Sequence, residues 1–196
     1  RGLKILVSAV QFRPEPLLMI KVEKKTLILS VCAVLIMVFL LSFLRQPKIY
    51  TFKKEQFVAS DIDTVFEFFS RPENLEKITP KKMGFNIITP KPIEMKEGAI
   101  IDYTVKILGV PMRWRTIISS YKKNEYFVDE QLKGPYSYWH HKHYFKVVDG
   151  GVMIIDEITY ALPLEAFRLI VHPLIIKPQL NEIFDFRFQT IQDKFN

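Results

Sequence analysis

The residues of this chain with the greatest capacity for chemistry are three histidines in the stretch GPYSYWHHKHYF, residues 134–145. His140, His141 and His143 make up all but one of the four histidines in the chain, and they lie beside Trp139. Imidazole side chains at this density suit metal binding, proton transfer or hydrogen bonding to a ligand. The direction in which each side chain points decides among these roles.

The stretch is rich in aromatic residues and is expected to form a β-strand, in which successive side chains point to opposite faces. His141 and His143 then share one face with Trp139 and Phe145, whereas His140 lies on the other face. The predicted strand therefore presents an aromatic face that carries two imidazoles.

A metal site would need more than these two histidines, because a closed or catalytic site needs a third ligand. The chain has no HExxH pattern, and His172 lies beside a proline in a different predicted element. Glu157 would serve only if it faced the same side as the histidines. We therefore predict no metal and no cofactor. The two imidazoles are expected either to hydrogen-bond within the sheet or to orient a carbonyl or hydroxyl group of a ligand.

The charge of the chain is concentrated near its N-terminus. The net charge is +7. Residues 1–48 carry eight Lys/Arg against two Asp/Glu, and residues 49–196 carry twenty against nineteen. The C-terminal part is therefore nearly neutral, which argues against a nucleic-acid partner. The single cysteine, Cys32, excludes an intrachain disulfide and a cysteine-based zinc site.

A membrane-spanning segment is predicted from TLILSVCAVLIMVFLLSFL, residues 26–44, which contain no charged residue. As a helix the segment would be about 28 Å long, close to the roughly 30 Å hydrocarbon core of a bilayer. An uncleaved N-terminal anchor over residues 25–45 fits this length better than a cleaved signal peptide does, and it makes the protein a single-pass membrane protein. Basic residues flank both ends, so the side of the membrane on which the domain lies is undetermined. Residues 1–24 are predicted to be an N-terminal tail. Met19 resembles a natural start, so residues 1–18 are expected to be either upstream sequence or flexible.

From residue 49 onward the pattern predicts one domain, residues 49–196, of the α+β class. A first strand at 49–58 is followed by two short helices, SDIDTVFEFFS and PENLEKIT, and then by strands separated by turns at Gly109-Val110-Pro111, Lys122-Lys123-Asn124 and Asp149-Gly150-Gly151. The later strands are predicted at 85–89, 99–108, 112–121, 125–132, 136–148 and 152–162. A long helical stretch follows Leu162-Pro163, with Pro173 and Pro178 expected to break or kink its first half. A curved antiparallel sheet of about seven strands must bury one face, and the long helix is its cover.

The order of these motifs resembles the SRPBCC superfamily, also called START-like, which includes polyketide cyclase/dehydrase and coenzyme-Q-binding START domains. More narrowly, the domain is similar to a bacterial group of small, cyclase-like ligand-binding proteins. The resemblance covers nearly all of residues 50–190, and its features are Phe66 with PENLEKITP, FNIITP, EGAIIDYTV, Gly109, Pro111, Trp114, FVDEQLKGPYSYWHHKHYF, Asp156, Tyr160, Leu162-Pro163 and IFDFR. It implies the helix-grip fold, in which a cavity between sheet and helix binds a hydrophobic molecule.

The resemblance also implies which residues meet a ligand. The expected ligand-binding residues are Tyr103, Trp114, Trp139, His141, His143, Phe145, Tyr160, Phe184 and Arg187. The family motifs single out three charged positions as well, Asp129, Asp156 and Arg187. We expect the arginine to reach a carboxylate of the sheet and form a structural ion pair.

Three functions follow from these features. The first is a membrane-anchored domain that binds a lipid, a quinone or a polyketide-like molecule; its partners are that ligand and, through residues 26–44, the bilayer. The second is a cyclase/dehydratase-type enzyme without a cofactor, with His141, His143 or Asp156 as acid and base. The third is a non-catalytic partner subunit whose cavity is filled by its own side chains.

Overall fold

The computed structural model describes residues 24–42, 47–163 and 168–195. The chain divides into two units near Val38, which are described separately. The predicted tail, apart from Lys24, and residues 43–45 of the predicted membrane helix lie outside the described residues.

Helix α1 (Lys24–Ser42) forms over the predicted apolar segment, and the side chains of residues 24–41 are all exposed. It is long and apolar enough to cross a membrane. A membrane anchor and a signal sequence both meet this criterion.

The second unit is built on a single antiparallel sheet of seven strands in the order β1-β7-β6-β5-β4-β3-β2. The strands are β1 (Ile49–Val58), β2 (Asn86–Ile87), β3 (Ile100–Ile107), β4 (Val110–Lys122), β5 (Tyr126–Lys133), β6 (Tyr138–Val148) and β7 (Gly151–Ala161). The predicted strands are confirmed, although β2 is only two residues long.

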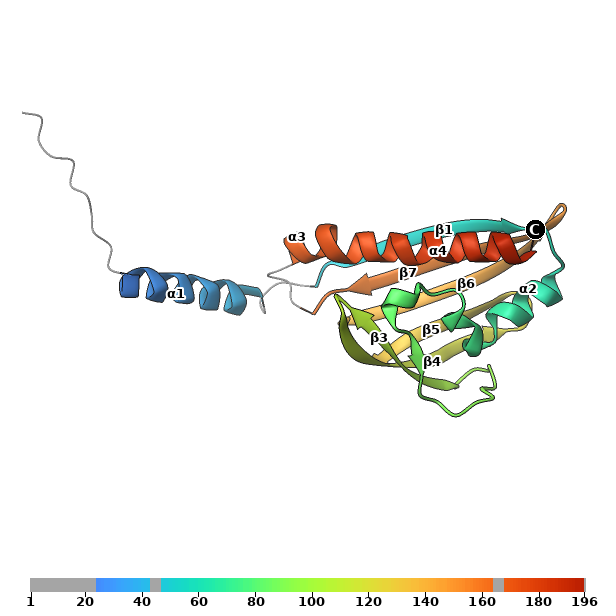
Figure 1. The fold of residues 1–196 in the computed structure, drawn as a ribbon, viewed down its shortest axis with the longest axis horizontal. Helices are drawn as coiled ribbons and strands as arrows, with labels where there is room; N and C mark the ends of the chain where they lie inside the picture. Colours follow the sequence, from blue (N-terminus) through green and yellow to red (C-terminus); the bar gives the residue numbers. More distant parts are fainter. Residues whose placement is uncertain (1–23, 43–46, 164–167, 196) are drawn as a thin grey trace, which may run out of the picture. The chain divides into compact units, whose positions relative to one another are not determined.

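The described helices of this unit lie between β1 and β2 and after β7 in the sequence. They are α2 (Ile62–Phe69), the 3₁₀ turns η1 (Pro72–Glu76) and η2 (Lys81–Met83), the short α3 (Arg168–Val171), the π-helical turn η4 (His172–Ile176) and α4 (Lys177–Phe195). Asp61 caps α2, because its carboxylate accepts a hydrogen bond of 2.8 Å from the backbone N–H of Thr64. In Figure 1, α4 runs beside β1, and the Gln56 side chain of that strand donates to the backbone carbonyl of Phe188.

The first half of the C-terminal helical stretch is interrupted at Pro173, as expected, by the π-helical turn between α3 and α4. Pro178 lies in the first turn of α4, where its missing N–H costs little. One detail differs from the sequence-based expectation. The β3–β4 turn lies at Leu108 and Gly109, which both have positive φ, and Val110 already belongs to β4. A two-residue turn of this kind matches the twist of the flanking strands.

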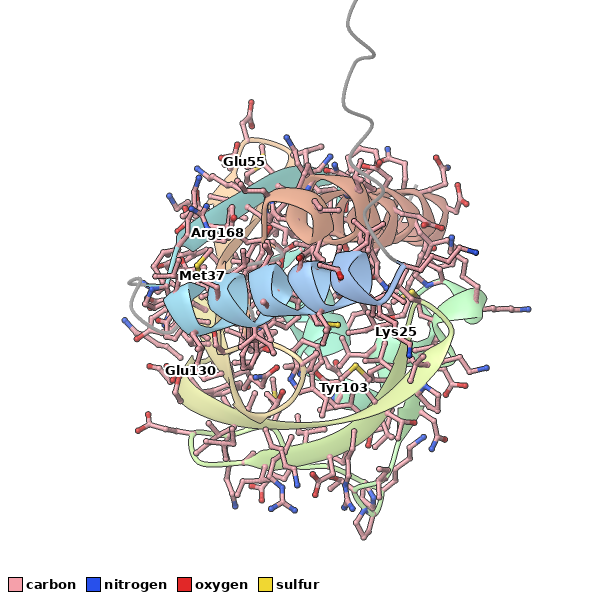
Figure 2. All side chains as sticks on the ribbon, turned by 90° about the vertical axis from the view of Figure 1, so that its left-hand side faces the viewer. Lys25, Met37, Glu55, Tyr103, Glu130 and Arg168 are labelled. Atoms are coloured by element: carbon pink, nitrogen blue, oxygen red, sulfur yellow. The ribbon has the colours of Figure 1, made fainter. Side chains whose placement is uncertain are left out.

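The sheet is curved around its interior, and irregular pairing between β4 and β5 contributes to the curve. The register shifts once between Arg115 and Thr116 and again between Ile118 and Ser120. Such bulges bend a strand and increase its local twist. In Figure 2, side chains lie inside this curve, and Tyr103 is among them.

The interior contains two hydrophobic clusters. One is centred on Phe66 of α2, whose ring packs edge-on against Phe127 and Phe145 of the sheet. The other gathers around Trp139 and Tyr160 and is covered by α4. The two clusters leave a cavity between them, and residues of both line it.

We predict that Phe66→Ala lowers the free energy of unfolding by about 3–5 kcal/mol, because the Phe66 ring is 1 % exposed and its removal leaves a void. The measurement is urea unfolding of the full chain in a mild detergent, followed by tryptophan fluorescence. Phe188→Ala is the control: Phe188 is 45 % exposed on α4, and the change should stay within about 0.5 kcal/mol. Equal effects of the two substitutions would contradict the packing described here.

Candidate functional site

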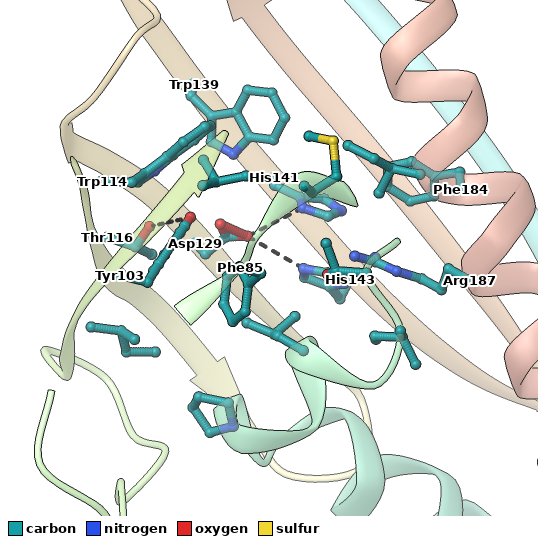
Figure 3. A pocket seen from close by; sticks show the side chains of 18 of the residues that line it. Phe85, Tyr103, Trp114, Thr116, Asp129, Trp139, His141, His143, Phe184 and Arg187 are labelled. Carbon is teal, nitrogen blue, oxygen red and sulfur yellow. Dashed lines mark hydrogen bonds and ion pairs between the residues drawn. The ribbon is translucent and has the colours of Figure 1, made fainter. Parts of the chain in front are cut away.

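The cavity lies between the concave face of the sheet, helix α4 and the segment that connects α2 to β3. Its volume is about 160 Å³. Its walls are mostly apolar, with Ile101, Val105 and Ile118 from the sheet and Leu180 and Phe184 from α4. The connecting segment contributes Pro72, Leu75, Ile78, Thr79, Met83, Phe85 and Met95. Figure 3 shows this space from close by.

One wall of the cavity carries a buried cluster of ionisable side chains. The strand register places Asp129 of β5 opposite His141 of β6, and His143 of β6 opposite Asp156 of β7. Because directly paired residues of an antiparallel sheet point to the same face, all four side chains meet on the concave side. The two histidines and Asp156 are each 5 % exposed.

Each imidazole of this cluster lies between the two carboxylates. His141 places Nε2 2.9 Å from Asp156 Oδ1 and Nδ1 3.3 Å from Asp129 Oδ2. His143 places Nδ1 2.7 Å from Asp156 Oδ1 and Nε2 3.3 Å from Asp129 Oδ2. Only the two Nε2 contacts are aligned as hydrogen bonds; His143 Nδ1 is close to Asp156 but out of line.

The charges of the cluster stabilise one another against the cost of burial. Burial alone would raise the pKa of each carboxyl group, but His141 and His143 hold the pKa values of Asp129 and Asp156 well below their usual range. Burial alone would lower the pKa of His141, but the two carboxylates raise it above its ordinary value. The two carboxylates therefore stay ionised, and their negative charge favours a cation at this wall of the cavity.

Arg187 of α4 completes this wall. Its Nη1 lies 3.7 Å from Asp156 Oδ1, and its guanidinium lies 4.6 Å from the centre of the Phe184 ring. The predicted ion pair between the covering helix and the sheet is thus present. Its Nε and Nη1 are buried without a hydrogen-bond partner, as is Nε1 of Trp114. Buried donors of this kind suit a ligand that brings acceptors.

Most of the residues expected to bind a ligand are brought together here. Those that line the cavity are Tyr103, Trp114, Trp139, His141, His143, Phe184 and Arg187. Phe145 and Tyr160 do not. Phe145 packs into the cluster around Phe66, and the Tyr160 hydroxyl hydrogen-bonds His172 Nε2 at 2.9 Å. The two residues share the concave face, but they lie beyond the part of it that the cavity occupies.

Other residues of the sequence-based hypotheses lie elsewhere. Asp156, a candidate acid or base, is in contact with both histidines but is not among the residues that line the cavity. His140 lies on the opposite face near Glu130, and Glu157 is 3.7 Å from Lys53. Asp129, which we expected only as an ion-pair partner, is the carboxylate that reaches the cavity with the histidines. Its alternation with the buried Phe127 could have indicated this.

The cavity-lining residues of the segment before β3 were not identified from the sequence as ligand contacts. Met83, Phe85 and Met95 come from short turns and irregular backbone. Such backbone has no periodicity that would indicate which side chains point inward.

Comparison with known proteins shows a likeness of fold alone. No protein-family model and no curated protein matches the sequence. Solved structures do match. The protein TTHA0849 from Thermus thermophilus has a TM-score of 0.59 at 10% identity, over 75% of this chain and 100% of that chain. The ZhuI aromatase/cyclase from Streptomyces sp. R1128 has a TM-score of 0.57 at 11% identity, over 75% and 93% of the two chains.

A third structure is a point mutant of norcoclaurine synthase from Thalictrum flavum in complex with a transition-state analogue. It has a TM-score of 0.55 at 18% identity, over 78% of this chain and 99% of that chain. The domain therefore shares the helix-grip fold of these structures, with a seven-stranded antiparallel sheet and a long C-terminal helix. Because one fold hosts many activities, function must be argued from the cavity itself.

Proposed function

We propose that this protein is a membrane-anchored binding protein for a hydrophobic small molecule, a lipid, a quinone or a polyketide-like compound. The observation that carries the proposal is the cavity between sheet and α4, with apolar walls and a few buried polar groups on one side. Ligand sites in proteins typically have this composition, because apolar walls supply affinity and a few polar groups fix orientation.

The size and polarity of the cavity narrow the ligand. A volume of about 160 Å³ lies below the roughly 300–1,000 Å³ of typical drug-sized sites. It suits a compact ring or the head of a longer molecule. The unpartnered donors of Trp114 and Arg187 favour a carbonyl or another acceptor on that group. An open cavity also argues against a partner subunit whose interior is filled by its own side chains.

The anchor is the second part of the proposal. Nineteen residues of α1 match the thickness of the hydrocarbon core, and their apolar side chains are exposed. A hydrophobic ligand is concentrated in the bilayer, so a domain tethered to the membrane lies where the local concentration of the ligand is highest.

Ligand binding can be followed through the two tryptophans of the chain, Trp114 and Trp139, because both line the cavity. We expect a short-chain ubiquinone to quench their fluorescence saturably with one site per full-length chain. Val105→Phe places a ring in the cavity and should weaken binding at least tenfold. Val147→Phe is the matched control, since Val147 is 70 % exposed on β6, and it should leave binding unchanged.

The binding proposal fails if neither ubiquinone, an anthraquinone nor a phospholipid quenches saturably and native mass spectrometry of the detergent-solubilised chain shows no retained small molecule.

Anchoring is tested by introducing charge at the centre of α1. The wild-type chain should remain in the membrane pellet after an alkaline carbonate wash. The double variant Leu35→Arg/Val38→Arg should be released, because each arginine costs about 2.5–3.5 kcal/mol at the centre of a membrane helix. Leu35→Ala/Val38→Ala should behave as wild type. Recovery of the wild-type domain in the wash, at a mass that lacks α1, would instead identify a cleaved signal sequence.

A second function is favoured by the histidines on the cavity wall, since imidazoles paired with carboxylates can act as acid and base. In this version the protein is a cyclase/dehydratase-type enzyme. His141→Asn/His143→Asn should then reduce turnover of a poly-β-ketone substrate at least 100-fold with the circular dichroism spectrum retained. His140→Asn should leave turnover unchanged. Full activity in the double variant would remove this version.

A further inference from the structure

The ligand-binding proposal does not explain how the two imidazoles of the buried cluster are hydrogen-bonded. All four ring nitrogens of His141 and His143 face carboxylate oxygens at 2.7–3.3 Å. A carboxylate only accepts hydrogen bonds, and a neutral imidazole has one N–H. Only the two Nε2 contacts are aligned as hydrogen bonds, so a neutral imidazole that donates through Nε2 turns the lone pair of its Nδ1 toward a carboxylate oxygen.

Two cations are unfavourable at this position. The ring centres of His141 and His143 are 3.7 Å apart, and both side chains are almost completely buried. Like charges at this separation repel strongly where water is excluded. If either histidine is neutral, one of its nitrogens turns a lone pair toward a carboxylate oxygen.

A metal ion removes this conflict. With a metal bound, Nε2 of His141 keeps the proton of its hydrogen bond to Asp156 Oδ1, and Nδ1 of His143, which lies 2.7 Å from the same oxygen but out of line, carries the proton of the second ring. The other two, Nδ1 of His141 and Nε2 of His143, then present lone pairs toward Asp129 Oδ2, which lies 3.3 Å from each. Three ligand atoms thus face one position, and Asp156 lies behind both imidazoles, hydrogen-bonded to His141 and 2.7 Å from Nδ1 of His143.

The spacing of these atoms fits direct coordination. Bonds of about 2.0–2.2 Å to nitrogen and oxygen, at angles of about 90–110°, place neighbouring ligand atoms about 3.0–3.4 Å apart. The distances of 3.3 Å from Asp129 Oδ2 to Nδ1 of His141 and to Nε2 of His143 fall in this range, and the three residues offer ligand atoms within 4.8 Å of one another. We propose that these three side chains bind one divalent transition-metal ion, with Asp156 as the outer carboxylate that orients both imidazoles.

The donor set and the surroundings define the class of metal. Two imidazoles and one carboxylate suit Zn²⁺ or Fe²⁺, which proteins often bind with positions left open for water or substrate. Here the open positions face the cavity, which all three ligands line (Figure 3). The positive charge of Arg187 is set against the outer Asp156, 3.7 Å away. An oxygen atom of water or of a bound molecule would complete the shell.

The metal proposal stands apart from the proposed function, because the ligands are complete without an organic molecule in the cavity. Its test therefore uses the metal alone. The full chain in detergent, stripped with a chelator and dialysed, should take up one equivalent of Zn²⁺ by calorimetry. One equivalent of Co²⁺ should give visible absorption bands, which Zn²⁺ then abolishes.

Variants assign the site. His141→Asn and Asp129→Asn should each weaken Zn²⁺ binding at least 100-fold. Asp156→Asn should weaken it about 10–100-fold, as loss of an outer carboxylate does. His140→Asn is the matched control, because His140 is the neighbouring histidine on the opposite face, and it should bind as wild type. Circular dichroism confirms that each variant is folded.

A measurement on the wild-type protein keeps the test decisive if a variant does not fold. X-ray absorption of the Zn²⁺-loaded chain should show two imidazole nitrogens at about 2.0–2.1 Å. The proposal is overturned by uptake of less than a tenth of an equivalent, by a spectrum without imidazole ligands, or by a folded His141→Asn protein with wild-type affinity. Failure of ubiquinone binding alone would leave the metal result intact and would count only against the ligand proposal.

Discussion

The interior of this domain depends on the mutual compensation of one buried carboxylate, one partly buried carboxylate and two buried histidines. Asp129 and Asp156 would be costly to bury as isolated ions. They are stabilised because β5, β6 and β7 pair in a register that places His141 and His143 between them. A slip of one residue would turn these side chains to the opposite face and leave the carboxylates without partners. The cluster therefore requires one particular alignment of three neighbouring strands.

The cavity follows from the way the rest of the chain packs around this alignment. The bulges between β4 and β5 bend the sheet, α2 fills one end of the concave face with phenylalanine rings, and α4 covers the other. Between the two hydrophobic clusters the walls do not meet. The ionisable cluster lies at the edge of that space, so the cavity combines apolar walls with strong polar groups on one side only.

This one-sided polarity connects the proposals. An apolar molecule would gain affinity from the walls and orientation from Arg187, Trp114 and the cluster. A metal ion bound by Asp129, His141 and His143 would make the polar side a site for an oxygen atom of that molecule. The fold by itself decides none of this, since proteins with the same sheet and helix differ in activity.

Much of the fold could be predicted from the sequence, because its signals are local. Alternation separated His140 from His141 and His143, and the apolar length of residues 26–44 indicated a helix able to cross a membrane. The seven strands were found by their composition and turns. Each of these features depends on residues close together in the chain.

What the tertiary structure decided was which distant residues meet. Alternation places Phe145 on the same face as the histidines, but only the packing of Phe66 shows that it belongs to the core and not to the cavity wall. The polar side chain that joins the two histidines on the cavity wall is that of Asp129, not that of Glu157 or His172. The sequence could not show this, because strand register is set by pairing across the whole sheet. The sequence by itself determined the faces of the strands; the register and the curvature of the sheet decided which side chains share a cavity.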